Sequence, residues 1–223
     1  MPYENILRRL RELGSPEMLG GMARFGINTV GAYGVSVTEL RRMAKKIGQN
    51  RELALWLWAS GVHEARILAS MVDDPERVTE RQMDSWVKDF DSWDVCDQVC
   101  GNLFDKTEFA YKKAFEWSRK SDEFVKRAGF VMMACLAVHD KTAKDKDLEK
   151  FLPIIVREAT DDRNFVKKAV NWALRQIGKR NARLNVSAVK TAIEIQKIDS
   201  PSARWIASDA LREFERKRSS AGR

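Results

Sequence analysis

The sequence has few residues that interrupt helices and no segment suited to secretion or membrane insertion. Five prolines and twelve glycines among 223 residues leave little material for the turns of a β-rich fold, which favours long helices. No apolar run approaches the roughly 18 to 20 residues that a membrane span needs, and residues 1–13 have no apolar signal-peptide core. With 44% hydrophobic and 32% charged residues, we expect a soluble helical protein in the cytoplasm.

Cysteine is scarce as well. Cys96 and Cys100 lie four residues apart in one predicted helix, and Cys135 lies far from both. Three cysteines cannot all pair, so we expect no disulfide framework, in agreement with a reducing compartment. Neither His63 nor His139 lies at zinc-ligand spacing from the cysteine pair. We therefore predict neither a metal site nor a cofactor.

Positive charge is concentrated in the C-terminal part of the chain. The whole sequence has 40 Lys or Arg and 32 Asp or Glu, a net charge of +8. Residues 163–223 hold fifteen Lys or Arg and five Asp or Glu, a net of +10, which leaves −2 for residues 1–162. A basic half favours a polyanionic partner such as nucleic acid, although a solvated basic surface would give the same count.

Apolar residues recur at helical spacing along almost the whole chain. Polar residues ahead of proline mark helix starts: Ser15 before Pro16, Ser200 before Pro201, and Asp73 two residues before Pro75. The segment 26–36 is rich in glycine and is predicted to be a loop. We predict helices over residues 3–13, 16–25, 37–48, 51–59, 62–72, 79–89, 92–104, 107–118, 121–138, 145–158, 162–178, 184–197 and 201–217.

The later helices resemble one another. FVKRA at 124–128 matches FVKKA at 165–169 with an offset of 41, and the ALR at 173–175 recurs at 210–212 with an offset of 37. Spacing near forty with two helices per unit is typical of HEAT-like and armadillo-like repeats. We predict an all-α helical-repeat solenoid with a concave basic surface, the alternative being an irregular helical bundle. We expect a single domain over residues 1–223, with flexible ends at 1–2 and 218–223.

The segment FDSWDVCDQVCGNLF (90–104) contains the most informative pattern. On a helix, Trp93 and Asp97 are four residues apart and share one face with Cys100, whereas Asp94 points elsewhere. An Asp in a helix interior has poor helix propensity and needs a hydrogen bond or a charged partner if it is partly buried. A structural interpretation is also open, in which Ser92, Asp94 and Asp97 serve the helix N-terminus and Trp93 anchors the core.

Four segments in the matching order resemble the AlkD-like DNA alkylation repair glycosylases. SWDVCD (92–97) resembles the WD-x-x-D element of that family. VKRAGFVMMACL (125–136) resembles its helix with a DNA-facing arginine, and FVKKAVNWALRQIGK (165–179) resembles its helix with a second tryptophan. MARFGINTVGAYGVSVTELRRMAK (22–45) resembles the family's N-terminal helix and loop. The resemblance covers residues 20 to 217 and implies a HEAT-like helical solenoid.

The resemblance implies a site that acts on the deoxyribose. Asp97 would stabilise the positive charge that grows on the sugar as the glycosidic bond breaks, while Trp93 and Trp172 would flank the cationic nucleotide. N3- or N7-alkylpurines are already cationic leaving groups, so no strong general acid is required. The implied activity is a monofunctional DNA glycosylase that excises these bases from duplex DNA.

The resemblance also implies contacts to the DNA backbone. Arg127 and Arg175 map to positions that would bind phosphates on either side of the lesion. Lys167, Lys168, Lys179 and Arg180 would extend this basic track, and Phe25 maps to the position of an aromatic residue near the lesion. The expected partner is double-stranded DNA with alkylated purines. We expect the protein to be a monomer that associates with the nucleoid when it binds DNA.

Two departures from the family pattern keep other functions open. Phe25 stands where better-known members have a tyrosine, and Ser92 stands where they have the first of two tryptophans. A catalytically inactive paralogue that binds DNA structures is therefore one alternative, and a HEAT-like scaffold for protein interaction is another. Other conspicuous residues have simpler interpretations: His63 and Glu64 in a surface or packing role, and Trp56, Trp58 and Trp86 in packing between helices.

Overall fold

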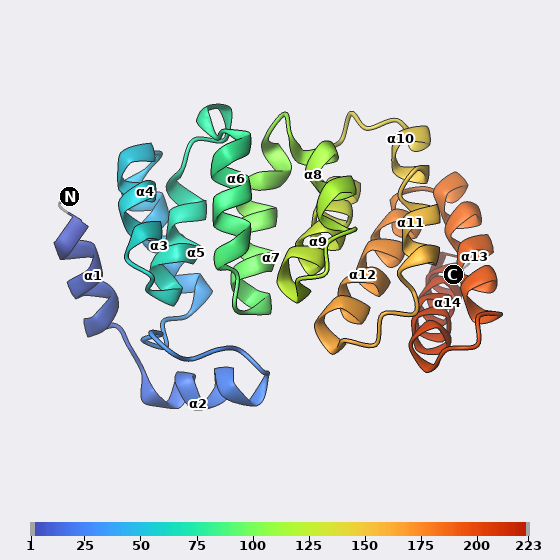
Figure 1. Cartoon of the computed structure of the whole chain (residues 1–223), viewed down its shortest axis with the longest axis horizontal. Coiled ribbons are helices and arrows are strands. Elements are labelled where there is room, and N and C mark those ends of the chain that lie inside the picture. The colour runs from blue at the N-terminus through green and yellow to red at the C-terminus, as the bar shows by residue number, and fades with distance from the viewer. Residues whose placement is uncertain (1–2, 222–223) are drawn as a thin grey trace. The chain divides into compact units, whose positions relative to one another are not determined.

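Helices make up the regular structure throughout the described part of the chain. The computed structural model describes the backbone of residues 3–221 and the side chains up to Arg216, and it has no strand in that range (Figure 1). The ends predicted to be flexible, 1–2 and 218–223, lie outside the described side chains. The chain divides into two compact units, residues 1–108 and 109–223. The single-domain organisation stays a prediction.

The first unit is organised around one central helix, α5. Its α-helices are α1 (Tyr3–Glu12), α2 (Pro16–Arg24), α3 (Val37–Ile47), α4 (Arg51–Ala59), α5 (His63–Val72), α6 (Glu80–Trp86) and α7 (Trp93–Asn102). Three short 3-10 helices follow α5, α6 and α7: η1 (Pro75–Arg77), η2 (Val87–Asp89) and η3 (Phe104–Lys106). Helix α5 packs against α3, α4 and α7. Neighbouring helices therefore bury most of α5, which in turn packs against α7.

Aromatic packing joins α4 to α6 in this unit. The rings of Trp58 and Trp86 are stacked with centroids 4.0 Å apart and planes 1° from parallel. The indole nitrogen of Trp58 donates to Asp89 Oδ2 at 2.8 Å, so its polar atom is satisfied although the side chain is buried. The predicted packing role is confirmed for these two rings. Trp56 is largely exposed, and its packing among the described rings is limited to the ring of Tyr3 on α1, with centroids 6.2 Å apart.

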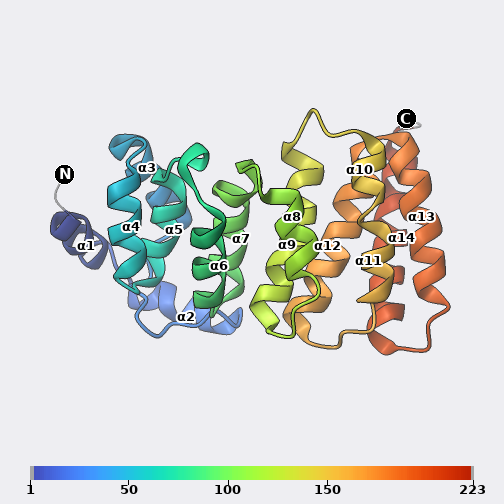
Figure 2. The same cartoon turned by 45° about the horizontal axis from the view of Figure 1, so that its top comes forward.

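The second unit contains the repeated segments. Its helices are α8 (Ala110–Trp117), α9 (Glu123–His139), α10 (Asp145–Glu149), α11 (Leu152–Arg157), α12 (Asn164–Arg180), α13 (Ala182–Gln196) and α14 (Pro201–Ala221). Helix α9 packs against α8 and α12, and α12 packs against α13 and α14 (Figure 2). Phe124 and Phe165, which begin the two matching segments, have ring centroids 5.6 Å apart. The two matching segments therefore belong to equivalent helices, α9 and α12, which lie side by side.

Two glycines allow helices of the second unit to approach closely. A Cβ atom on Gly129 of α9 would lie 2.4 Å from the backbone nitrogen of Ser118, at the end of α8. A Cβ atom on Gly178 of α12 would lie 2.5 Å from the ring of Phe214 and 2.9 Å from Ala188. Both distances are well inside van der Waals contact, so these positions require glycine for packing.

Most predicted helices are present, with some differences at their ends. The helix predicted over 145–158 is divided into α10 and α11, because Pro153 stands in the first turn of α11 and lacks the N–H that a continuous helix would need. The helix predicted over 79–89 ends at Trp86 and continues as η2. Ser15 caps α2 as predicted, whereas the cap before Pro75 is Asp74 rather than Asp73. No helix in the described range is both long and apolar enough for a membrane span.

Candidate functional site

The start of α7 is tied to the loop that follows α2. The indole nitrogen of Trp93 donates to the carbonyl oxygen of Phe25 at 3.0 Å. The backbone N–H of Asn28 donates to Ser92 Oγ at 3.3 Å, and the Asn28 side chain donates to Asp91 Oδ2 at 2.8 Å. The Trp93 ring is half-buried, while the Phe25 side chain is 75% exposed. The tether therefore fixes the indole and presents the Phe25 ring to solvent.

Asp97 lies one turn after Trp93 on α7, as predicted from their spacing. Its side chain is half-buried, so the carboxylate is neither in the core nor fully exposed. Cys96 and Cys100 are completely buried, so Cys100 does not share the exposure of Trp93 and Asp97 on the predicted common face. The roles of Trp93 and Asp97 stay predictions, and the partly accessible positions of both side chains are compatible with them.

Asp94 points toward α5 and forms a buried pair with His63. Asp94 Oδ2 lies 2.8 Å from His63 Nε2, and Asp94 Oδ1 accepts a hydrogen bond from Ser92 Oγ at 2.6 Å. The His63 and Asp94 side chains are 4% and 13% exposed. Ser92 makes no cap with its own side chain, and its hydroxyl donates to Asp94 in the first turn of α7 instead.

Each partner of this pair favours the charged form of the other. Burial disfavours the charge on His63, but the hydrogen bond and negative charge of Asp94 outweigh it, and the pKa of His63 is raised above its ordinary value. Burial likewise opposes the charge on Asp94, but the hydrogen bond and charge of His63 and the Ser92 hydroxyl bring the pKa of Asp94 below its ordinary value. The sequence analysis missed this pair, because 31 residues separate its members and no local pattern links them.

The Glu64 carboxylate binds backbone N–H groups of the glycine-rich loop. Its carboxylate is almost completely buried and accepts backbone N–H bonds from Tyr33 at 3.0 Å, Gly34 at 2.6 Å and Val35 at 3.2 Å. Gly34 has φ of +80°, and a Cβ atom there would lie 2.4 Å from the carbonyl oxygen of Ser15. The surface role considered for His63 and Glu64 is therefore wrong, and both belong to the packed support of the site.

In the second unit, Trp172, Arg175 and Lys179 recur at helical spacing along one side of α12. All three side chains are half-buried. Arg175 forms ion pairs with Asp209 at 3.2 Å and with Glu213, and Lys179 pairs with Glu213 at 2.8 Å. Carboxylates of α14 thus neutralise Arg175 and Lys179 in the absence of DNA. The phosphate contacts of these two cations stay predictions.

The other predicted backbone contacts are dispersed over the second unit. Arg127 is 5% exposed, and its guanidinium donates to the carbonyl oxygen of Phe165 at 2.6 Å, which joins α9 to α12. Lys167 lies over the ring of Trp205 at 5.2 Å from its centroid, and Lys168 is exposed. The guanidinium of Arg180 donates to the carbonyl oxygens of Ala137 and Ala143. Their roles toward DNA stay predictions.

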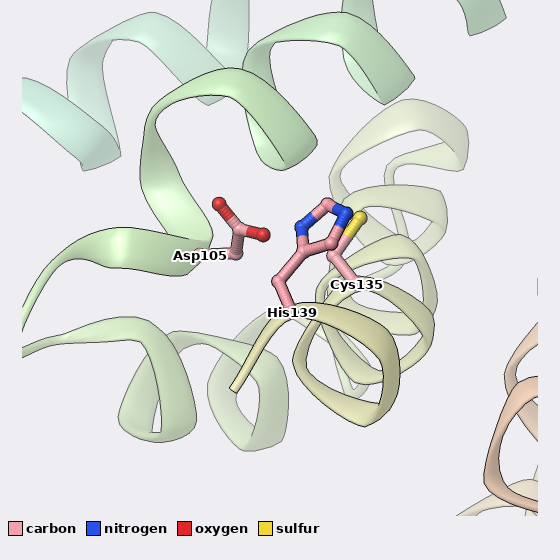
Figure 3. A group of neighbouring side chains, drawn as sticks. All are labelled: Asp105, Cys135 and His139. Carbon is pink, nitrogen blue, oxygen red and sulfur yellow. The ribbon is translucent and has the colours of Figure 1, made fainter. Parts of the chain in front are cut away.

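Cys135 and His139 lie one turn apart on α9 (Figure 3). Each offers one ligand atom, and these atoms lie within 4.8 Å of each other. The absence of a metal site stays a prediction.

Comparisons with known proteins agree with this architecture. The sequence profile of the family described as "DNA alkylation repair enzyme" matches residues 6–214. A solved structure described as belonging to "a new family of proteins related to the HEAT-like repeat DNA glycosylases with affinity for branched DNA structures" superposes with a TM-score of 0.82. That match has 22% sequence identity and covers 98% of this chain and 96% of the other. A search of curated proteins found no match.

The match confirms the predicted all-α fold of HEAT-like repeats, since the superposition extends over nearly the full length of both chains. The profile extends over most of the sequence and includes all four segments on which the resemblance rests. The protein therefore belongs to the DNA alkylation repair enzyme family.

Proposed function

We propose that this protein is a monofunctional DNA glycosylase that excises N3- and N7-alkylated purines from duplex DNA. The observation that carries the proposal is the first half of α7, where Trp93 and Asp97 lie one turn apart, both partly accessible, and the Trp93 indole bonds to the Phe25 carbonyl. Membership of the DNA alkylation repair family supports the same reaction. The basic excess in residues 163–223 supports a DNA partner.

The proposed chemistry requires little acid catalysis. The alkylated purine is cationic, so when the C1′–N bond breaks, the bonding electron pair leaves with the base and neutralises it. Positive charge grows on the deoxyribose, and the Asp97 carboxylate stabilises this charge where it develops. Water then adds to C1′ and loses its proton, which completes hydrolysis.

The aromatic residues have a separate task in this proposal. Trp93 and Trp172 hold the cationic nucleotide through cation–π contacts, each worth about 0.5–2 kcal/mol. A neutral, undamaged purine gains less from the same rings, so charge alone gives selectivity for the lesion. Phosphate contacts by Arg127, Arg175 and neighbouring lysines, with Phe25 near the lesion, position the strand.

A second candidate is a catalytically inactive protein that binds DNA structures. It is favoured by the superposition on a protein whose family is described as having affinity for branched DNA. Phe25, which lacks the hydroxyl of a tyrosine, also fits this candidate. It predicts salt-sensitive DNA binding, a preference for branched over linear duplex, and no base release.

Base release from methylated duplex DNA distinguishes the two candidates. We expect the wild type to release 7-methylguanine, measured by chromatography of the free base, and Asp97→Asn to lower the rate by about 100-fold or more because it removes the stabilising charge. Duplex affinity should change by less than about twofold. The matched control is Glu52→Gln, which neutralises an exposed carboxylate of α4 in the same unit and should act as the wild type does.

The proposal is refuted if Asp97→Asn and the wild type release base at equal rates. If neither protein releases base and both bind branched DNA tightly, the second candidate is correct.

A further inference from the structure

A pocket of about 430 Å³ lies where α9 and α12 end and α13 begins, entirely within the second unit. Three cations line it, Lys141, Lys179 and Arg180, together with the amide side chains of Gln176 and Asn181. No carboxylate is among the residues that line it. From the sequence, Lys179 and Arg180 were expected to contact DNA, whereas Lys141, Gln176 and Asn181 were not.

Two of these cations bond only to neutral oxygens in the described hydrogen bonds. The Lys141 ammonium donates to the carbonyl of Val138 at 2.5 Å. The Arg180 guanidinium donates to the carbonyls of Ala137 at 2.9 Å and Ala143 at 3.4 Å. Carbonyl oxygens hold a cation in position without neutralising its charge. Only Lys179 has a carboxylate partner, Glu213, which it shares with Arg175.

Capping of α9 accounts for part of this arrangement. The last carbonyls of a helix carry about half a negative charge in total, and cations near them are stabilising. Lys141 and Arg180 bring two full charges to the end of the same helix, which exceeds the charge of the helix end, and the Asp140 carboxylate offsets part of the excess. Asp140, the nearest carboxylate in sequence, accepts from Tyr111 Oη at 2.9 Å and from Thr142, and it does not line the pocket.

The position of the pocket indicates which anion it would take. Lys179 follows Arg175 and Trp172 on the same side of α12, so the pocket continues the line of residues assigned to the damaged strand. The volume exceeds that of one phosphate group and allows an attached sugar. The guanidinium, ammonium and amide N–H donors of the pocket match the oxygens of a phosphodiester.

We infer that this pocket binds a backbone phosphate of the DNA strand that lies along α12, with Lys141 and Arg180 as its main cationic contacts. The inference rests on the proposed DNA partner but does not require base release. Each phosphate contact that is lost should lower the salt dependence of DNA binding by a defined amount.

The test is a fluorescence anisotropy titration of the intact protein with labelled undamaged duplex between 50 and 200 mM salt. We expect Lys141→Gln to weaken binding several-fold at the lowest salt and to reduce the slope of log K against log salt by about 0.9. The matched control is Lys190→Gln, the same charge change at an exposed position on α13, which should keep the wild-type slope. Arg180→Lys retains the charge and tests the second cation, with the melting temperature checked because Arg180 also caps α9.

The outcomes separate the pocket from the proposed function. If Lys141→Gln and Lys190→Gln both keep the wild-type slope, the pocket is not a DNA phosphate site. A third outcome is that inorganic phosphate shifts the NMR signals of the pocket residues while Lys141→Gln leaves the slope of log K against log salt for DNA binding unchanged. The pocket then binds free phosphate, and its assignment to DNA is wrong. If the wild type binds no duplex at 50 mM salt, the proposed function itself fails.

Discussion

Replacing Asp94 by asparagine removes one charge of the buried His63–Asp94 pair. Both side chains are mostly shielded from water, at 4% and 13% exposure, so solvent cannot replace the lost interaction. Breaking a buried ion pair by removing one partner costs about 3–5 kcal/mol. In a unit of this size each kcal/mol lowers the melting temperature by about 4 °C or more, so we expect a fall of at least about 12 °C.

The pH dependence follows from the two pKa shifts. The pKa of His63 is raised in the folded state, so its contribution is complete below its unfolded pKa of about 6.5 and is lost as pH rises through the folded pKa. The pKa of Asp94 is lowered, so its contribution is complete above its unfolded pKa and is lost as pH falls through the folded pKa. The acidic groups that act on His63 are Asp94, Glu64 and Asp91. Stability should therefore decline above about pH 6.5 in the wild type.

Urea denaturation at a series of pH values from 5 to 9 measures both effects. We expect Asp94→Asn to be less stable throughout this range and to show a weaker decline above pH 6.5, because the hydrogen bond and charge of Asp94, the largest of the interactions that raise the pKa of His63, are then lost. The control is Glu52→Gln, which neutralises an exposed carboxylate of α4 in the same unit and should change stability by no more than about 0.5 kcal/mol. Equal stability of Asp94→Asn and the wild type, or an unchanged slope with pH, would show that the pair contributes no charge coupling.

Three further variants test other features. Gly129→Ala should lower stability by about 1–3 kcal/mol because the added Cβ meets backbone at 2.4 Å. Its control is Gly20→Ala, where nothing lies within 4 Å of the added Cβ, and this change should be neutral or stabilising by up to about 1 kcal/mol. Equal melting temperatures of the two variants would contradict the packing argument. Glu64→Gln should cost about 1–3 kcal/mol in urea denaturation, since an amide oxygen is a weaker acceptor for the loop N–H groups; an unchanged midpoint would mean that the loop holds its shape without the charge. Trp93→Phe should accelerate hydrogen exchange of Asn28 without unfolding the unit, because only the tether to the Phe25 carbonyl is lost, and unchanged exchange would rule the tether out.

Local patterns account for the parts of the fold that were predicted. Helical periodicity and caps such as Ser15 depend on residues within a few positions of each other, so the sequence alone indicates them. The repeat of FVKRA and FVKKA identified α9 and α12 as equivalent helices, which the Phe124–Phe165 contact bears out. The division of residues 145–158 could have been predicted, because Pro153 lacks the N–H that a continuous helix would bond to the preceding turn and is favoured in the first turn of a helix.

The candidate site was predicted only where its residues are close in sequence. Trp93 and Asp97 share a helix, so their spacing indicates that they lie one turn apart. The pairing of His63 with Asp94 and the burial of Arg127 depend on packing between helices, and no local signal precedes them. The charge count located the basic excess but could not tell which cations have carboxylate partners, as Arg175 does, and which bond only to carbonyls, as Arg180 does.

The attachment of the Trp93 indole to residue 25 is made through the main chain. Any amino acid at this position would present the same carbonyl, so the side chain can change without releasing the indole. Evolution, or a library that varies residue 25, can thus change the size and hydrogen bonding of the exposed side chain while the Trp93 indole on α7 stays in place. Under the proposed function, tolerance of different adducts would in this way diverge between relatives without any change in α7.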